Sequence, residues 1–262
     1  MEEISKVFLL ISLFILALGL YFFYNWYYRS VPQSGIYTLP QVPGPKSTDT
    51  ILIFSPHPDD ETIAAGGYVK AATSTGATVW IVLVTDGNKH HLEKIRYNEF
   101  ENATGALGVS FDHLIYLDYP DGALKNENQA DVQEAFKKIV LQINPDIIFV
   151  PHPKDTHPDH ATTGIDAEKV ITALKSKPQV YYFLVHFPHF PTQKGLKEKL
   201  YVTPPLKLLE FSKEWVSFSL TQKMEDAKQS ALLTYKSQLM FPPLRALIEA
   251  FPRRNELFEI KK

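Results

Sequence analysis

Two short segments of the chain concentrate imidazole and carboxylate side chains. The first is "FSPHPDDE", residues 54–61, and the second is "PHPKDTHPDH", residues 151–160. Each directly follows an apolar run, "TILIF" or "DIIFV". Histidine and aspartate bind divalent metals, and both also serve as general acids and bases. If the fold brings the two segments together, they predict a metal-assisted site for acid–base chemistry.

The first segment and the end of the second can supply a complete metal site. A metal that activates water usually takes three protein ligands and leaves a position open. His57, Asp60 and His160 make such a set. Because Pro58 stiffens the turn, His57 and Asp60 can point the same way. Asp59, next to the metal but not needed as a ligand, suits a general base that takes a proton from the attacking water.

The other histidines have more than one interpretation. His157, three residues before His160, can act as an imidazolium that stabilises an oxyanion or protonates a leaving group, with Asp159 orienting it. A single His-Pro-Asp motif could equally be the capped start of a helix. Two such motifs at the ends of strands that should converge make that interpretation unfavourable. No ligand position is left for His152. For His186, in "VHFPHFP", packing within an aromatic loop is favoured over a place at a pocket mouth.

The elements around these segments predict why they should converge. Apolar runs at 50–54, 78–84, 113–117, 146–150 and 179–185 read as buried strands, and 60–74, 90–107, 128–143 and 160–175 carry helical spacing. This alternation predicts a single Rossmann-like α/β domain with a mostly parallel sheet and helices on both faces. In a 3-2-1-4-5 order, the first and fourth strands are neighbours at the switch point, where ligands bind. The turn after the first strand lacks G-x-G-x-x-G, which excludes a dinucleotide site of that type.

Composition narrows the classes of function further. The chain has 262 residues, a formal net charge of −2 and no cysteine. That length suits one α/β domain of ordinary size. The charge gives no basic footprint for nucleic acid, so we expect no nucleic-acid partner. Without cysteine, thiol nucleophiles and disulfides are excluded, and a metal must be held by His, Asp or Glu. Oligomeric state is not predicted.

The N-terminus predicts a membrane attachment. Val7–Tyr24 runs for 18 residues without a charge and is followed by Trp26 and two tyrosines, which suit a membrane interface. A cleaved signal peptide is the alternative, but no small-x-small site follows the run. We therefore predict a single-pass anchor over 1–29, a linker over 30–48 and a catalytic domain over 49–262. Flanking charges do not decide the orientation, and we favour an extracytoplasmic domain. Residues 239–254 suit a packed helix, with a lipid-surface segment or a pocket cover as alternatives.

The order of motifs resembles a known family. Strand-PHPDDE-helix followed by strand-x-HPDH-helix is similar to the LmbE-like, or PIG-L, zinc-dependent de-N-acetylases, which act on N-acetylglucosaminyl conjugates. "IRYNEFENATGALGV" (95–109), "YPDGAL" (119–124) and "KQSALLTYKSQ" (228–238) extend the resemblance. It implies the same ligand triad, base and oxyanion partner as above, and it places Arg96 and Asp121 near the sugar-binding end of the crevice. The chain departs from the family pattern at Tyr235, where His is common, and at Asp155, where the family often has an aromatic or small residue.

Together these features predict a metal-dependent hydrolase that removes the acetyl group from an N-acetylglucosamine-type sugar, free or linked to a lipid or polymer. Zinc is the default metal, and two histidines with one carboxylate also suit Fe²⁺. One alternative is a single-metal hydrolase of another amide or ester; a phosphoesterase would need a second metal and more carboxylates. Another is a non-catalytic sugar-binding protein displayed at the membrane, which is disfavoured because binding alone requires neither Asp59 nor His157.

Overall fold

Seven strands form one sheet whose order brings the two His/Asp segments to the same edge. The computed structural model describes residues 2–89, 91–174 and 177–261. The strand order is β3-β2-β1-β4-β5-β7-β6. β1 pairs in parallel with both β2 and β4, and β7 runs antiparallel to β5 and β6. The predicted 3-2-1-4-5 order is therefore confirmed. The strands are β1 (Thr50–Ser55), β2 (Thr78–Thr85), β3 (Leu114–Tyr119), β4 (Ile147–Pro151), β5 (Gln179–Phe183), β6 (Lys213–Ser219) and β7 (Asn255–Lys261).

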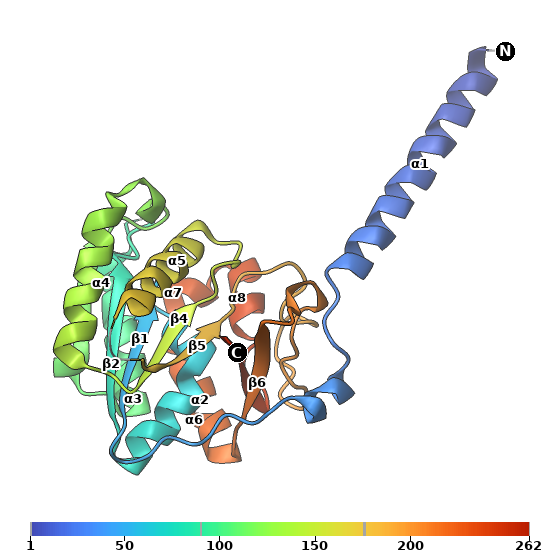
Figure 1. Cartoon of the computed structure of the whole chain (residues 1–262). Helices are drawn as coiled ribbons and strands as arrows, with labels where there is room; N and C mark the ends of the chain where they lie inside the picture. The colour runs from blue at the N-terminus through green and yellow to red at the C-terminus, as the bar shows by residue number, and fades with distance from the viewer. Residues whose placement is uncertain (1, 90, 175–176, 262) are drawn as a thin grey trace.

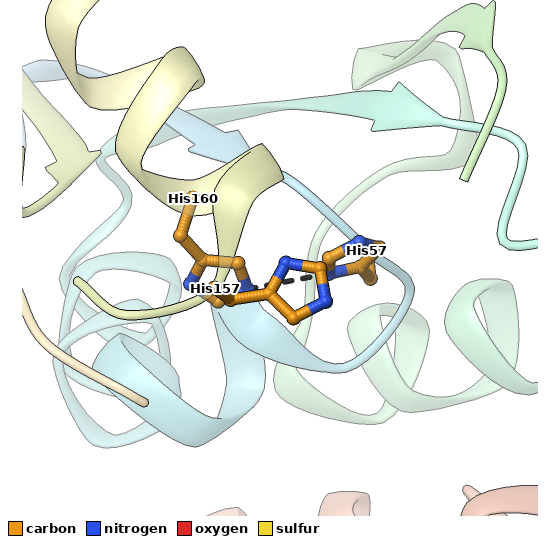
Figure 2. Close-up of side chains that lie close together, drawn as sticks. All are labelled: His57, His157 and His160. Atoms are coloured by element: carbon orange, nitrogen blue, oxygen red, sulfur yellow. Dashed lines mark hydrogen bonds between the residues drawn. The ribbon is translucent and has the colours of Figure 1, made fainter. Parts of the chain in front are cut away.

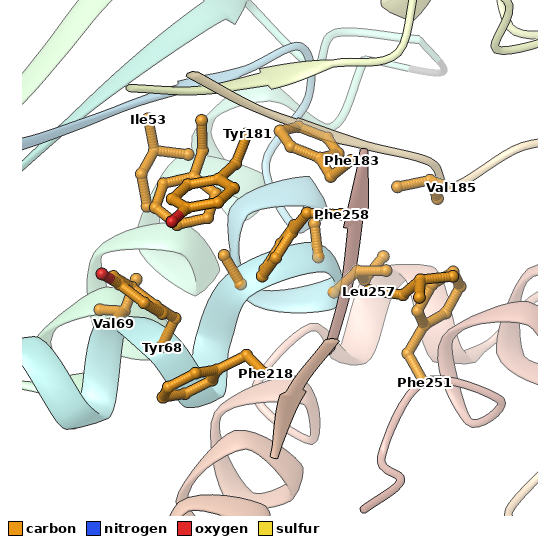
Figure 3. Close-up of a cluster of buried hydrophobic side chains, with 14 of the residues drawn as sticks. Ile53, Tyr68, Val69, Tyr181, Phe183, Val185, Phe218, Phe251, Leu257 and Phe258 are labelled. Atoms are coloured by element: carbon orange, nitrogen blue, oxygen red, sulfur yellow. The ribbon is translucent and has the colours of Figure 1, made fainter. Parts of the chain in front are cut away.

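Helices cover both faces of the sheet, as predicted (Figure 1). Side chains alternate along β1, so Ile51 and Ile53 enter one apolar core while Leu52 and Phe54 enter the other. The first core is rich in aromatic rings, which pack between the sheet and the helices beneath it (Figure 3). The main helices are α2 (Asp60–Thr75), α3 (Glu93–Leu107) and α6 (Gln222–Leu232) on that side, and α4 (Gln129–Ile143) and α5 (Pro158–Ala173) on the other.

The C-terminal part adds elements that the periodicity did not predict. β6, α6 and β7 complete the sheet edge and the helical layer. Two short helices follow α6, namely α7 (Lys236–Leu239) and α8 (Pro242–Ile248). Within residues 239–254, Pro242–Ile248 forms α8, whose Ile248 is buried, in agreement with the favoured packed helix. Leu244 and Leu247 of the same helix line the cavity described below, so α8 also has the placement expected of a pocket cover.

The N-terminal helix stands away from the domain (Figure 1). α1 spans Glu2–Tyr27, and Lys6–Tyr27 is long and apolar enough to cross a membrane by length and composition. The predicted linker does not hang free. Its Ile36 and Val42 are buried, and the Val42 backbone N–H donates to Ser217 O over 2.9 Å. The end of α1 is therefore held close to the domain surface. The division into anchor, linker and domain stays a prediction.

Candidate metal centre

Two helix N-termini carry the predicted site residues to the carboxyl edge of the sheet. α2 begins at Asp60, directly after the turn that leaves β1, and α5 begins at Pro158, after the loop that leaves β4. β1 and β4 are adjacent, with Leu52 opposite Ile148. A Cβ at Gly164 would overlap the Pro151 carbonyl oxygen, so only glycine lets α5 pack this closely on the end of β4. This close packing helps to bring His160 against the first turn.

The three predicted ligands converge on one point, and Figure 2 shows two of them, His57 and His160, facing each other beside His157. His57 Nδ1 lies 3.2 Å from His160 Nε2 and 3.2 Å from Asp60 Oδ2, and Asp60 Oδ2 lies 3.0 Å from His160 Nε2. The three atoms form a nearly equilateral triangle. A tetrahedral zinc with bond lengths of roughly 2.0–2.2 Å spaces its ligand atoms about 3.4 Å apart. The residues present therefore fit a divalent metal with one face open.

A carboxylate lies behind each imidazole. His57 Nε2 is 3.1 Å from Asp159 Oδ2, and His160 Nδ1 is 3.3 Å from Asp155 Oδ2. With the proton placed on the nitrogen that faces the carboxylate, the other nitrogen of each ring is free to bind a metal. Burial lowers the pKa of His57, but hydrogen bonds to Asp121, Asp159 and Asp60 outweigh it, and the net pKa is raised well above the usual value. The site therefore favours positive charge.

The structure corrects the role expected for Asp159. Its carboxylate does not face His157. It lies against His57 and accepts the backbone N–H groups of Gly122 (2.6 Å) and Leu124 (3.2 Å). His157 is the N-cap of α5, and its Nδ1 accepts the backbone N–H of Asp159 instead. A side chain in the first turn of the helix can point toward the neighbouring β1 turn, which is why the Asp159 carboxylate lies against His57.

His157 lies beside the ligands with its ring 4.6 Å from that of His57 and 5.1 Å from that of His160. Burial, followed by the neighbouring His57 and His160, lowers the pKa of His157 to about 4. The free protein therefore carries this ring neutral at pH 7, not as the predicted imidazolium. Because Nδ1 accepts a backbone hydrogen bond, the group left to face the cavity is Nε2–H, a hydrogen-bond donor.

Asp59 combines an unusual backbone with a perturbed carboxyl group. Its φ of 136° lies in a region that non-glycine residues seldom adopt. Burial raises the pKa of Asp59, the neighbouring Asp60 raises it further, and Arg96 opposes both; the net pKa is well above the usual value. Such a carboxyl group can exchange a proton nearer to neutral pH, as a general base requires.

Arg96 and Asp121, predicted near the sugar-binding end, both reach the cavity but also hold the turn. Arg96 donates to Pro58 O over 3.1 Å and to Asp121 Oδ2 over 3.2 Å. Burial raises the pKa of Asp121, but the contacts with His57 and Arg96 outweigh it and leave the pKa at about 2. The structure brings all eight predicted site residues together. A role for these two in binding sugar stays a prediction.

The cavity at the site has a volume of about 200 Å³. Most of the side chains that line it are polar, and its apolar lining comes from Ile63 together with Leu244 and Leu247 of α8. His186 also lines it, with ring distances of 4.8 Å to His160 and 5.2 Å to His157. The prediction that His186 packs within an aromatic loop is therefore wrong. The lining residues are His57, Asp59, Asp60, Ile63, Lys89, Arg96, Asp121, His157, His186, Gln238, Leu244 and Leu247.

Not every histidine of the second segment belongs to the site. His152 is fully buried, and its Nε2 lies 3.1 Å from Glu259 Oε1 on β7. Its ring stacks on Trp215 at 6.0 Å. The prediction that His152 is not a ligand agrees with this placement. His186, by contrast, follows β5, the neighbour of β4, so the same strand-end argument that found the ligands could have found it.

Metal affinity should depend on pH. Burial lowers the pKa of His160, but Asp60 and Asp155 outweigh it and raise the pKa to about 9. A metal must displace this proton, because only the neutral nitrogen binds. Affinity should therefore rise about tenfold per pH unit for each of the two histidines that is still protonated, and the contribution of His160 should level off above about 9. Metal titrations of the metal-free protein across this range measure it, and affinity independent of pH would contradict the arrangement.

Comparisons with known proteins agree with this geometry. Residues 52–171 match the family model PIG-L, described as GlcNAc-PI de-N-acetylase. A "Probable N-acetyl-alpha-D-glucosaminyl L-malate deacetylase 2" of Bacillus anthracis is 29% identical over 151 residues, which cover 52% of this chain and 66% of the relative. A "Diacetylchitobiose deacetylase" of Thermococcus kodakarensis is 31% identical and covers 44% of this chain and 46% of the relative. The chain thus spans slightly under two thirds of the first relative and under half of the second.

The fold is shared over a longer stretch. The solved structure of an N,N'-diacetylchitobiose deacetylase from Pyrococcus horikoshii superposes with a TM-score of 0.60 and 23% sequence identity, covering 80% of this chain and 82% of that one. The likeness in structure shows a shared fold, and the match of residues 52–171 to the PIG-L model supports the family resemblance drawn from the motifs. All three predicted metal ligands, Asp59 and His157 fall inside the matched range of 52–171.

Proposed function

We propose, on the premise that residues 52–171 belong to the PIG-L family, that this protein is a metal-dependent hydrolase that removes the acetyl group from an N-acetylated amino sugar. The observation that carries the proposal is the triangle of His57, Asp60 and His160 with Asp59 in the same cavity. Asp59 supplies a general base, which a site that only binds sugar does not need. The named relatives act on N-acetylated sugars, which supports this substrate class.

The side chains can divide the reaction among them. A bound divalent cation lowers the pKa of water and polarises a carbonyl oxygen. Asp59 accepts the proton of the attacking water and can pass it to the departing amine. His157 donates from Nε2–H to the oxygen of the former carbonyl, where negative charge develops. Arg96, 3.6 Å from Asp59, holds the turn that carries the base. The products are acetate and the free amino sugar.

Zinc is the metal we propose, with Fe²⁺ as the second choice for two imidazoles and one carboxylate. Elemental analysis of protein purified without added metal, followed by reloading with each metal, separates the two. Activity restored by zinc alone supports the first choice.

The attachment of α1 favours a substrate held at the membrane surface. The ring of Tyr24, within the candidate span, lies 5.3 Å from that of His189, and the ring of Tyr28 lies 5.7 Å from that of Phe187. His186 at the cavity is three residues before His189, a distance of at most about 11 Å along the chain. The cavity therefore lies close to the membrane end of α1, within reach of a sugar attached to a lipid.

The test is acetate release by the full chain in vesicles, with free, polymeric and lipid-linked N-acetylglucosamine offered in turn. We expect release from the lipid-linked sugar to be fastest, and we expect the Asp59→Asn variant to release little from any of them. Binding without acetate release would favour the sugar-binding alternative. Release of another acyl group or ester product, but no acetate, would favour a different single-metal hydrolase.

Removing the anchor should separate substrates by their location. Lys6–Tyr27 is not buried, and Tyr24 and Tyr28 contact the domain through His189 and Phe187. A chain starting at Tyr28 keeps the contact with Phe187 and should retain kcat/KM for free sugars. For a lipid-linked sugar in vesicles, kcat/KM should fall at least about tenfold, because the anchor no longer concentrates enzyme at the surface. Equal losses on both kinds of substrate would contradict a role for α1 in substrate access.

A further inference from the structure

A tyrosine from the C-terminal part of the chain reaches beneath the metal-binding turn. Tyr235 lies between α6 and α7 and is fully buried. Its hydroxyl donates to Glu61 Oε1 over 2.5 Å, across 174 residues of sequence. Glu61 directly follows the two aspartates of the turn and is fully buried as well. It contributes no atom to the ligand triangle, so its burial needs another explanation.

The Glu61 carboxylate is saturated by four neutral donors. Oε1 accepts the hydroxyls of Tyr235 (2.5 Å) and Thr62 (2.6 Å). Oε2 accepts the Ser55 hydroxyl (2.9 Å) and the backbone N–H of Asp59 (3.2 Å). A carboxylate offers about four lone-pair positions, and here each one is used. The orientation of the carboxylate is thus fixed by donors from β1 and the start of α2 together with the Tyr235 hydroxyl from the C-terminal part of the chain.

The fourth donor connects this network to the reaction. The Asp59 backbone, with φ of 136° and ψ of −29°, is in a conformation that costs a non-glycine residue energy and persists only when its surroundings hold it. Glu61 Oε2 accepts a hydrogen bond from the Asp59 backbone N–H and so holds this conformation in place. Ser55, whose hydroxyl donates to Glu61, also approaches His57 O at 2.8 Å. The turn from His57 to Asp59 therefore rests on the Glu61 carboxylate.

We propose that Tyr235 is a positioning residue for Asp59, acting through Glu61. Its hydroxyl fixes the carboxylate, and the carboxylate fixes the backbone that aims the base into the cavity. This inference rests on the proposed function, in which Asp59 takes the proton from water.

The same segment ties the cavity wall to a second buried carboxylate. Ser237 donates from its backbone N–H and its hydroxyl to the two oxygens of Glu99, over 2.8 and 2.6 Å. Gln238, the next residue, lines the cavity. Residues 235–238 are therefore held at both ends while they touch the site, so loss of the Tyr235 hydroxyl should leave the segment in place. The effect of that loss should be local to the Glu61 side.

The test is Tyr235→Phe, with Tyr68→Phe as the matched control. Tyr68 is also a buried tyrosine, and its ring packs in the aromatic core away from the cavity. We expect Tyr235→Phe to lower kcat about fivefold to tenfold, the effect of one hydrogen bond, with KM and metal content unchanged. Tyr68→Phe should leave kcat as it is. Hydrogen exchange of residues 57–62 should accelerate in Tyr235→Phe only.

A double-mutant cycle then shows whether the effect passes through Glu61. In a Glu61→Gln background, Tyr235→Phe should lower kcat by less than about twofold further, because the link is already weakened. Additive losses, unchanged exchange of residues 57–62, or a fall in kcat matched by Tyr68→Phe would each overturn the proposal. Exchange does not depend on turnover. If the parent protein released no acetate, the proposed function would fail while the exchange data still decided the positioning.

Discussion

Replacing His160 with alanine is expected to remove the metal and the activity together. The three proposed ligand atoms lie within 3.2 Å of one another. We expect a metal bound by the two that remain to dissociate during dialysis. The change also leaves Asp155 and Asp60 without the imidazole between them. We expect metal affinity to fall by at least about 10³-fold and acetate release to fall to background. Elemental analysis after dialysis and a turnover assay measure the two effects.

His113→Ala is the matched control. His113 lies at the start of β3, at the far edge of the sheet, where its ring stacks on Trp80 at 4.3 Å. It should keep full metal content and activity. Full metal occupancy in His160→Ala would contradict the triad, and it would direct attention to His186, which lies close enough to Asp60 to take part in a different site.

The part of the fold that positions the site was predictable because its strands are buried on both faces. β1, β2 and β4 are continuous apolar runs, and such runs stand out against helices of period 3.6. β7 gave no such signal. It buries Asn255, Glu256 and Glu259, and buried polar residues are recognisable only from partners elsewhere in the chain.

Those partners are specific contacts that no local pattern encodes. Glu256 accepts the ammonium group of Lys228 at 2.7 Å and the backbone N–H of Gly67 at 2.7 Å. Glu259 Oε1 lies close to both His152 Nε2 and Lys213 Nζ, whereas the buried Glu259 Oε2 has no hydrogen-bond partner among the described residues. The partners of these two glutamates are therefore brought to β7 by the tertiary fold. The spacing of apolar residues in Asn255–Lys261 therefore predicts a loop rather than a strand.

The candidate site divides in the same way. The convergence of the proposed ligands and Asp59 was predictable because each lies in a short motif directly after a strand, and the strand order decides which motifs meet. The carboxylate of Asp159 could not be assigned from sequence, since its partner depends on which face of the first turn of α5 meets β1. The burial of Ile36 and Val42 within the predicted linker could not be assigned from sequence for a similar reason. Both are isolated apolar residues among prolines, and the segment that carries Val42 is held to β6 by backbone hydrogen bonds from Val42 N–H to Ser217 O and from Ser217 N–H to Pro40 O.

Asp59→Asn is the second substitution with a large expected effect, because it separates proton transfer from metal binding. Asparagine keeps the size of the side chain but cannot accept the proton of the attacking water. We expect kcat to fall by about 10²-fold or more, while metal content and substrate affinity stay near those of the parent. Asp60→Ala should do the reverse and lose the metal first, since Asp60 Oδ2 lies within 3.2 Å of both histidine ligands.

The pH profile gives Asp59→Asn a second readout. Burial, followed by the charge of Asp60, raises the pKa of Asp59. Protonation as the pH falls removes the base, so kcat/KM of the parent should decline on the acid side, at a higher pH than an ordinary carboxyl group would give. That limb should vanish from the residual activity of Asp59→Asn, which has no group to titrate there. If instead Asp59→Asn empties the site of metal while Asp60→Ala keeps it filled, the two neighbouring aspartates have exchanged roles, and the base must be sought at Asp60.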